Sequence, residues 1–286
     1  MYYFTNILFG LENQTEFPRS LNDKILWRLT VKESSKSKAL KGDGNYWDGG
    51  TFRQKSVEIA EGGGVRALID GAWQELMPVE LPERFLKWNF GARKKMIEGI
   101  KAGQMPTTMA GPHNASVATW GALRSDSVMK INNAVKGTGF LPKAELIAEV
   151  IQRLDDTIDS PMEEKLDVLL ELYSAGRDVF DITRQVSLEL YATPDFETGS
   201  FINQMTNPAC SLVYMDIPSY ELKCVAQLLH PDDPSLGEYE KHIVDYINLI
   251  HSYFHGEFSK LFIAVVYHII EVFDNSPAHK GVRLAP

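Results

Sequence analysis

The sequence has few cysteines and lacks the short motifs of the common cofactor sites. Its 286 residues include only two cysteines, Cys210 and Cys224, which do not form a CxxC pair. This spacing excludes a zinc site built from cysteine pairs and favours reduced thiols over a disulfide framework. No GxGxxG, GxxxxGKS, GxxxxGKT, GxSxG or HExxH motif occurs. A dinucleotide fold, a phosphate-binding loop, a serine nucleophile elbow and a zinc protease helix are therefore not expected.

Long apolar runs and runs of basic residues are also missing. The longest apolar stretch, residues 261–270, falls well short of the ~20 residues that a helix needs to cross a bilayer. Residues 1–17 lack the basic start and the small-residue cleavage site of a secretory signal. The basic residues lie scattered among acidic ones and the net charge is −9, unlike a dedicated nucleic-acid binder. We expect a cytoplasmic protein with no membrane contact and no nucleic-acid partner.

Charge is distributed unevenly along the chain. Residues 1–143 contain 20 basic and 14 acidic side chains, whereas residues 144–286 contain 9 and 24. The two parts therefore carry net charges of +6 and −15. Opposite fields attract over a Debye length of ~8–10 Å. The pattern favours two unlike modules, or a homo-oligomer whose oppositely charged surfaces meet.

The N-terminal part of the chain has the pattern of short strands followed by one helix. Apolar residues make up 44% of the chain, which is typical of a globular protein. Alternating apolar and polar residues predict strands over 2–9, 24–31, 56–61, 65–69 and 72–77. Short links between them, such as the turn at Gly62, favour an antiparallel β-meander. From Pro82 to Gly103 the apolar residues repeat at helical spacing, which predicts a helix of about five turns.

The rest of the chain reads as a long loop followed by helices. Residues 104–142 are rich in Gly, Pro, Asn, Ser and Thr and predict a loop with at most one short element. Helical spacing then predicts helices over 146–158, from 160 onwards, and over 220–229, 235–255 and 259–273. We therefore predict an α+β fold with a mostly antiparallel N-terminal β-meander plus helix and an all-helical C-terminal half. The two modules would be residues 1–142 and 143–286, around one shared core.

Two polar residues of the predicted helix after Pro82 fall within its apolar stripe. At about 100° per residue, Asn89 and Arg93 point toward the core. A buried guanidinium needs a partner, because an unpaired buried charge costs several kcal/mol, and its planar fork suits a carboxylate. Arg93 is therefore either an anchor for an anionic small molecule or one half of a structural ion pair.

The apolar segment 259–273 carries two further polar residues. His268 and Glu271 lie three residues apart, so in a helix they would share one side. Glu271 could pair with Arg93, or it could orient His268 as a general base near neutral pH. The alternative is a buried hydrogen bond with no catalytic role.

Histidines provide two more candidate sites. The loop 111–116 places His113 beside Asn114, an arrangement found both at active-site edges and in plain turns. His251 and His255 lie one helical turn apart before His268, and the three could hold iron or zinc. The helical stripe instead places His251 at its edge and His255 toward solvent, which favours surface histidines.

These observations lead to one principal hypothesis and two alternatives. We expect a cofactor-free biosynthetic enzyme that uses acid–base chemistry on a carboxylate-bearing substrate such as an amino acid derivative. The reaction classes are condensation or cyclisation, decarboxylation and isomerisation. The predicted catalytic residues are His268, Glu271 and His113, and the predicted substrate-binding residues are Arg93, Asn89 and Asn114. One alternative is a non-catalytic helical protein of interaction or oligomerisation, and the other is a non-haem metal enzyme that uses iron or zinc.

Overall fold

The described part of the chain is built around one large curled sheet with helices packed beside it. The computed structural model describes residues 40–104, 110–256 and 258–286, and residues from 40 onwards form one compact unit. The α-helices described are α3 (Glu83–Lys101), α4 (Ile147–Asp156), α5 (Met162–Ala175), α6 (Gly199–Thr206) and α7 (Glu238–His255). A short 3-10 helix, η1 (Gly176–Asp178), follows α5. The strands predicted over 2–9 and 24–31 lie outside the described residues.

Three short strands form a small separate sheet. They are β1 (Val57–Ile59), β2 (Val65–Ile69) and β3 (Ala72–Leu76), paired antiparallel in chain order. Val57, Val65 and Ala67 pack against Val225 of the large sheet. The predicted strands and the turn at Gly62, whose φ is +90°, are therefore confirmed.

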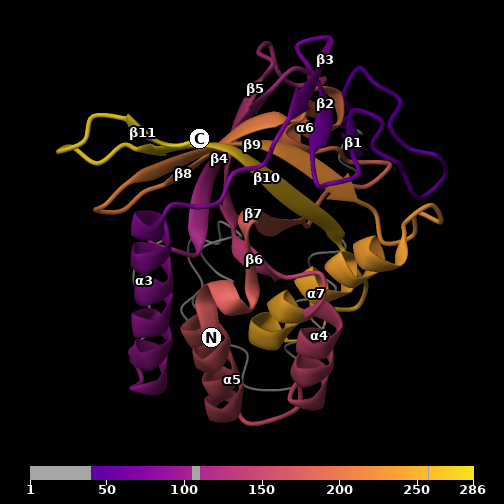
Figure 1. Cartoon of the computed structure of the whole chain (residues 1–286). Helices are drawn as coiled ribbons and strands as arrows, with labels where there is room; N and C mark the ends of the chain where they lie inside the picture. Colours follow the sequence, from indigo (N-terminus) through magenta and orange to yellow (C-terminus); the bar gives the residue numbers. More distant parts are fainter. Residues whose placement is uncertain (1–39, 105–109, 257) are drawn as a thin grey trace, which may run out of the picture. The chain divides into compact units, whose positions relative to one another are not determined.

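The large sheet is antiparallel and curls because its two ends are consecutive in the chain. Its strands are β4 (Asn114–Trp120), β5 (Ile131–Gly137), β6 (Gly139–Pro142), β7 (Phe180–Glu189), β8 (Ala209–Tyr214), β9 (Tyr220–Leu229), β10 (Ile263–Asp274) and β11 (Val282–Ala285). The order is β5-β4-β8-β9-β10-β7-β6, with β11 beside β10. Strand β5 pairs with β4, and only Thr138 separates it from β6, which pairs with β7. The sheet is thereby bent into a half-barrel (Figure 1).

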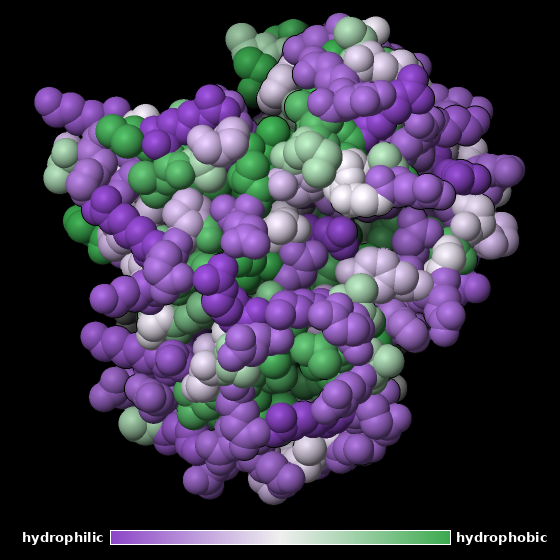
Figure 2. Space-filling view, viewed as in Figure 1, coloured by the Kyte–Doolittle hydropathy of each residue, from purple (hydrophilic) through white to green (hydrophobic). Residues whose placement is uncertain are grey.

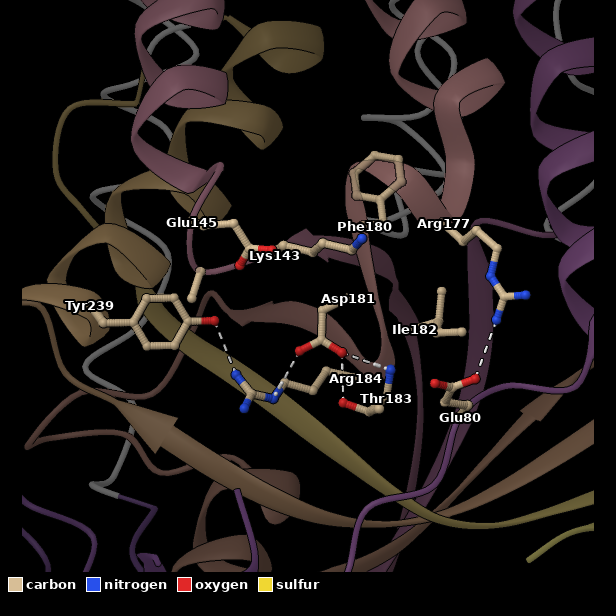
Figure 3. A pocket seen from close by; sticks show the side chains of 11 residues that line it. Glu80, Lys143, Glu145, Arg177, Phe180, Asp181, Ile182, Thr183, Arg184 and Tyr239 are labelled. Atoms are coloured by element: carbon tan, nitrogen blue, oxygen red, sulfur yellow. Dashed lines mark hydrogen bonds and ion pairs between the residues drawn. The ribbon is translucent and has the colours of Figure 1, made fainter. Parts of the chain in front are cut away.

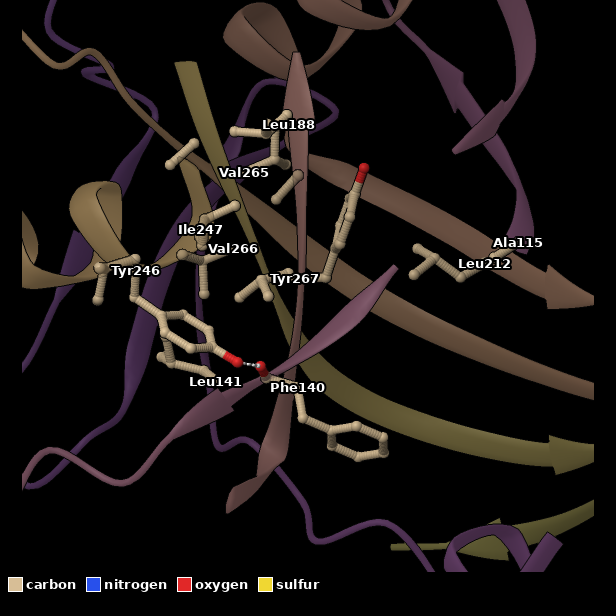
Figure 4. Packing of buried hydrophobic residues seen from close by; sticks show 14 of the residues in the cluster. Ala115, Phe140, Leu141, Leu188, Leu212, Tyr246, Ile247, Val265, Val266 and Tyr267 are labelled. Carbon is tan, nitrogen blue, oxygen red and sulfur yellow. Dashed lines mark hydrogen bonds between the residues drawn. The ribbon is translucent and has the colours of Figure 1, made fainter. Parts of the chain in front are cut away.

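Helices close one side of this sheet. Figure 1 shows α4, α5 and α7 gathered below the strands, with α3 alongside. In the core, Tyr246 and Ile247 of α7 lie against the strands near Leu141 and Val266, and the Tyr246 hydroxyl donates to the Phe140 carbonyl at 3.1 Å (Figure 4). Tyr267 extends to the opposite face, because successive strand residues alternate. Both faces of β10 are therefore buried.

The prediction of an all-helical C-terminal half is wrong. Strands β7 to β11 lie in that half, and the segments predicted as helices over 220–229 and 259–273 are β9 and β10. A central strand that is buried on both faces reads as a continuous apolar run, which periodicity cannot distinguish from a buried helix. Its β-branched and aromatic residues were the signal for a strand.

The predicted loop over 104–142 is also wrong in large part. Strands β4, β5 and β6 lie within it. Strand β5 has no fully buried residue, so its alternation is polar and weak, and the sequence gives little sign of it. The helix after Pro82 is confirmed as α3, and the helices predicted after 146, after 160 and up to 255 are confirmed as α4, α5 and α7. Within the described residues, no helix combines the length and apolar character that a membrane span requires.

Candidate functional site

Arg93 is buried as predicted, and its guanidinium is held in a cluster of hydrogen bonds. Its side chain on α3 is 1% exposed. The Nε atom donates to Asn89 Oδ1 at 2.6 Å. One terminal nitrogen donates to His113 Nδ1 at 2.8 Å and to the Tyr173 hydroxyl at 3.2 Å. The other terminal nitrogen donates to the carbonyl oxygens of Pro112 at 2.6 Å and Thr138 at 2.9 Å. A guanidinium has five N–H donors. These five acceptors occupy all of them, and none is a carboxylate.

The structure thus brings together three of the predicted site residues, Arg93, Asn89 and His113. Burial, with the Arg93 charge as a second cause, holds the pKa of His113 well below its usual value. A neutral His113 accepts from Arg93 at Nδ1, so its proton is on Nε2, which is buried with no partner among the described residues. Asn114 begins β4 directly after this loop. The geometry favours a packing role for Arg93, and its role as a substrate anchor stays a prediction.

His268 and Glu271 take part in different contacts. His268 Nε2 bonds to the Gln227 amide oxygen at 3.0 Å, and Nδ1 is buried with no partner among the described residues. Burial, with the nearby Arg184 charge, lowers the pKa of His268 to about 3, so its imidazole is neutral near pH 7. Glu271 forms ion pairs with Lys223 at 3.1 Å and Arg283 at 2.7 Å. No contact between His268 and Glu271 is present in the described structure.

Two histidines of the predicted metal site, His251 and His268, form other contacts, and the third lies outside the described side chains. His251 Nδ1 contacts the carbonyl of Ile247 one turn earlier on α7 at 2.7 Å. His268 is on β10, and the side chain of His255 lies outside the described residues. In the part of the chain that the structure describes, no three His, Cys, Asp or Glu side chains gather as a metal-binding group.

A polar groove beside β7 brings together residues that the sequence did not single out. Its volume is about 400 Å³. It lies where the start of β7 meets η1, the segment before α4, the segment before α3 and the first turn of α7 (Figure 3). The lining residues are Glu80, Lys143, Ala144, Glu145, Arg177, Phe180, Asp181, Ile182, Thr183, Arg184 and Tyr239.

Two of the three cations in this groove are neutralised by neighbouring carboxylates. Arg184 Nε lies 3.3 Å from Asp181 Oδ2, and Arg184 also donates to the Tyr239 hydroxyl at 3.1 Å. Arg177 donates to Glu80 at 3.2 Å. Burial raises the pKa of Tyr239, so its phenol stays protonated. Because the Tyr239 oxygen accepts from Arg184, its own O–H is available to a bound molecule.

Lys143 is the third cation, and it differs from the two arginines. Its side chain is half-buried, and its ammonium forms no ion pair within the described residues. In Figure 3 its nitrogen points across the groove toward Phe180. The Glu145 carboxylate, on the Tyr239 side of the groove, likewise has no cationic partner in the described part of the chain.

The sequence offered little sign of this groove. Arg184 and Asp181 lie on β7, which was not predicted, and Lys143 and Tyr239 are separated by almost 100 residues. The only signal was the proximity of opposite charges in 177–184, which is also typical of an exposed surface. Their convergence depends on the pairing of β7 with β6 and on the position of α7.

Fold and groove together define a mostly β protein with a curled antiparallel sheet and a charged groove at its helical side. Comparison with protein-family models found no match, and comparison with curated proteins found no significant match.

Proposed function

We propose that this protein is a small-molecule enzyme that binds a carboxylate-bearing, amino-acid-like substrate in the groove beside β7. The observation that carries the proposal is Lys143, a half-buried residue whose ammonium has no ion-pair partner among the described residues. Opposite charges attract more strongly in a partly buried site than in bulk water, and a charge-assisted hydrogen bond is about twice as strong as a neutral one. The neighbouring Arg177 and Arg184 already have carboxylate partners, so a bound anion would meet Lys143.

The rest of the groove fits the other end of such a molecule. Glu145 offers a carboxylate with no cationic partner among the described residues, and Tyr239 offers a hydroxyl. Three cations and three carboxylates line the groove, so its net charge is zero, which suits a zwitterion better than a simple anion. A volume of about 400 Å³ lies within the usual range of small-molecule sites.

The chemistry we propose is proton transfer without an organic cofactor, as in condensation, cyclisation, decarboxylation or isomerisation. Asp181, Glu145 and Tyr239 are the groups of the groove that could give or take a proton. Asp181 is fixed for such a role, because its Oδ1 accepts from the Thr183 N–H at 2.8 Å and the Thr183 hydroxyl at 2.6 Å. We place this activity in the cytoplasm, on the sequence features alone.

The binding test is titration calorimetry with a panel of amino acids and their N-acyl and keto acid derivatives. We expect the best ligand to lose at least about tenfold in affinity in Lys143→Met, since one charged contact is worth ~1.5–3 kcal/mol. Lys241→Met is the matched control, because Lys241 is exposed on α7 and lies outside the groove. Equal affinity in wild type and Lys143→Met would contradict the proposal.

Catalysis needs a separate readout. Incubation of the same ligands in D₂O, followed by proton NMR, detects exchange at the carbon next to the carboxylate and any conversion of the ligand. We expect exchange or conversion in wild type and its loss in Asp181→Asn. Binding without exchange or conversion would contradict the proposed enzymatic activity and would indicate a protein that only binds the ligand.

A role in self-association is the second candidate. Val128, Met129 and Ile131 are 96%, 66% and 71% exposed. Val128 and Met129 lie in the connection between β4 and β5, and Ile131 begins β5. Figure 2 shows apolar surface at the top of the view, where Figure 1 places this hairpin. Exposed apolar clusters mark interfaces between proteins. Light scattering should then give a multiple of the chain mass that falls to one chain in Met129→Lys, and a monomeric wild type at all concentrations would exclude this role.

A further inference from the structure

A second pocket lies where loops from distant parts of the chain converge at one end of the large sheet. It shares no lining residue with the groove, and its volume is about 280 Å³. The lining residues are Trp47, Gly50, Glu189, Ala192, Thr193, Pro194, His230, Pro231, Asp232, Lys260, Leu261, Phe262 and Ile263. They come from the segment before β1, the end of β7, the β9–α7 loop and the start of β10.

His230 is the polar centre of this pocket. Its side chain is 8% exposed, and its ring stands edge-on to Trp47 and Phe52, at 5.9 and 5.2 Å between centroids. The Asp232 N–H donates to Nδ1 at 3.1 Å, so the neutral ring carries its proton on Nε2. Nε2 has no partner among the described residues and is not sealed off from solvent. A buried histidine thus presents one N–H donor to the pocket.

Flat apolar walls surround this donor. One face of the Trp47 indole stacks on Phe201, with centroids 5.2 Å apart, and Trp47 itself is only half-buried. Phe262, Pro194 and Pro231 complete the walls. Aromatic and proline surfaces of this kind suit a planar ring.

Two opposite charges stand at the same pocket. Asp232 is exposed and Lys260 is exposed, and neither forms an ion pair within the described residues. The Lys260 ammonium lies 5.5 Å from the centre of the Phe262 ring. Glu189 also lines the pocket, but its carboxylate is bound to Lys136 at 2.8 Å. His230 and Lys260 therefore offer donors to the pocket, and Asp232 offers an acceptor.

From this arrangement we propose a second binding site, which takes a planar nitrogen heterocycle with a hydrogen-bond acceptor beside a donor, the chemistry of a purine or pyrimidine base. The ring lies against Trp47, its acceptor meets the Nε2–H of His230, and its N–H group donates to the Asp232 carboxylate. Lys260 is placed to meet a further acceptor or an acidic substituent of the ring. The site does not depend on the function proposed for the groove.

The test is titration calorimetry with adenine, hypoxanthine, uracil and nicotinamide as probes. In His230→Asn the side-chain oxygen replaces Nδ1 as the acceptor of the Asp232 N–H, while the donor into the pocket is lost. In His230→Gln an amide N–H returns near the position of Nε2. We expect at least one probe to bind, to weaken at least tenfold in His230→Asn, and to recover most of that loss in His230→Gln.

Two outcomes would overturn the proposal. One is that none of the four probes binds with a Kd below 1 mM; the other is that the bound probe keeps its affinity in His230→Asn. Thermal melting of each variant shows that the fold is retained. Lys143→Met separates the two sites, because it should leave heterocycle binding unchanged while His230→Asn leaves amino acid binding unchanged.

Discussion

At the scale of single residues, the cations Arg93 and Lys143 differ in how their charge is satisfied. Arg93 donates all five of its N–H groups to buried protein acceptors, whereas Lys143 has no ion pair among the described residues. The sequence could predict that Arg93 is buried, because its helix has a clear apolar stripe. It could not predict the partners, because these are backbone carbonyls and side chains up to 80 residues away.

The hydrogen bonds of Arg93 should contribute strongly to the free energy of unfolding. Arg93→Met removes the donor from the Thr138 carbonyl, Asn89 Oδ1 and His113 Nδ1, whereas the Pro112 carbonyl keeps the Asn89 amide at 3.3 Å. Each unsatisfied buried group costs ~1–3 kcal/mol. We expect urea unfolding to show a loss of about 3 kcal/mol or more. Lys95→Met is the control, since Lys95 is exposed on the same helix. A loss below about 1 kcal/mol in Arg93→Met would show that these contacts contribute little.

His268 should make the fold sensitive to acid. Its folded pKa of about 3 lies below the ordinary histidine value of 6.5, so below pH 6.5 the unfolded chain takes up a proton that the folded chain does not. The contribution of neutral His268 to the free energy of unfolding is fully present above pH 6.5 and is lost as the pH falls from 6.5 toward 3. At 1.36 kcal/mol per pH unit, the loss from pH 8 to pH 5 is about 2 kcal/mol.

The variant His268→Gln isolates this effect. Glutamine does not titrate, so the difference in unfolding free energy between wild type and variant should shift by about 2 kcal/mol between pH 8 and pH 5, in favour of the variant at pH 5. Chemical denaturation at both pH values measures it. A difference that stays constant with pH would mean that His268 titrates normally in the folded protein.

At the scale of secondary structure, one buried ion pair links β5, at one end of the sheet order, to β7, the strand next to the other end. Lys136 on β5 bonds to Glu189 on β7 at 2.8 Å, and their side chains are 14% and 1% exposed. Removing one partner of a buried pair costs about 3–5 kcal/mol, because the other charge is left buried. We expect Lys136→Met to destabilise strongly and the double variant Lys136→Met with Glu189→Gln to recover most of the loss. If the double variant is no more stable than Lys136→Met, the loss in Lys136→Met does not come from the unpaired charge of Glu189.

The helices were easier to predict than the strands, for reasons visible in particular elements. In α3 and α4 the apolar residues fall on one face, so period 3.6 identifies them. Strand β10 is buried on both faces and has no such period, and β5 lies at a sheet end with neither face fully buried. Strand pairing is also non-local: β10 lies between β7 and β9, which are both earlier in the chain. Nothing in a local pattern specifies this order.

At the scale of the whole molecule, both pockets form where distant segments converge. The groove joins residues from Glu80 to Tyr239, and the second pocket joins residues from Trp47 to Ile263. Polar residues that interrupt an apolar pattern, such as Arg93 and His268, can be recognised in the sequence, and both are buried. Groove residues such as Lys143 have polar neighbours in the sequence, so they can be recognised as one site only from the assembled fold.

The measurement that tests the central claim most directly is the structure of the protein with the tightest ligand of the amino acid panel. We predict that the ligand carboxylate lies within hydrogen-bond distance of Lys143 Nζ, at about 2.7–3.0 Å, with its other polar end toward Glu145 and Tyr239. The claim would be contradicted if the ligand occupied the pocket at His230, or the cluster at Arg93, and left the groove at Lys143 empty.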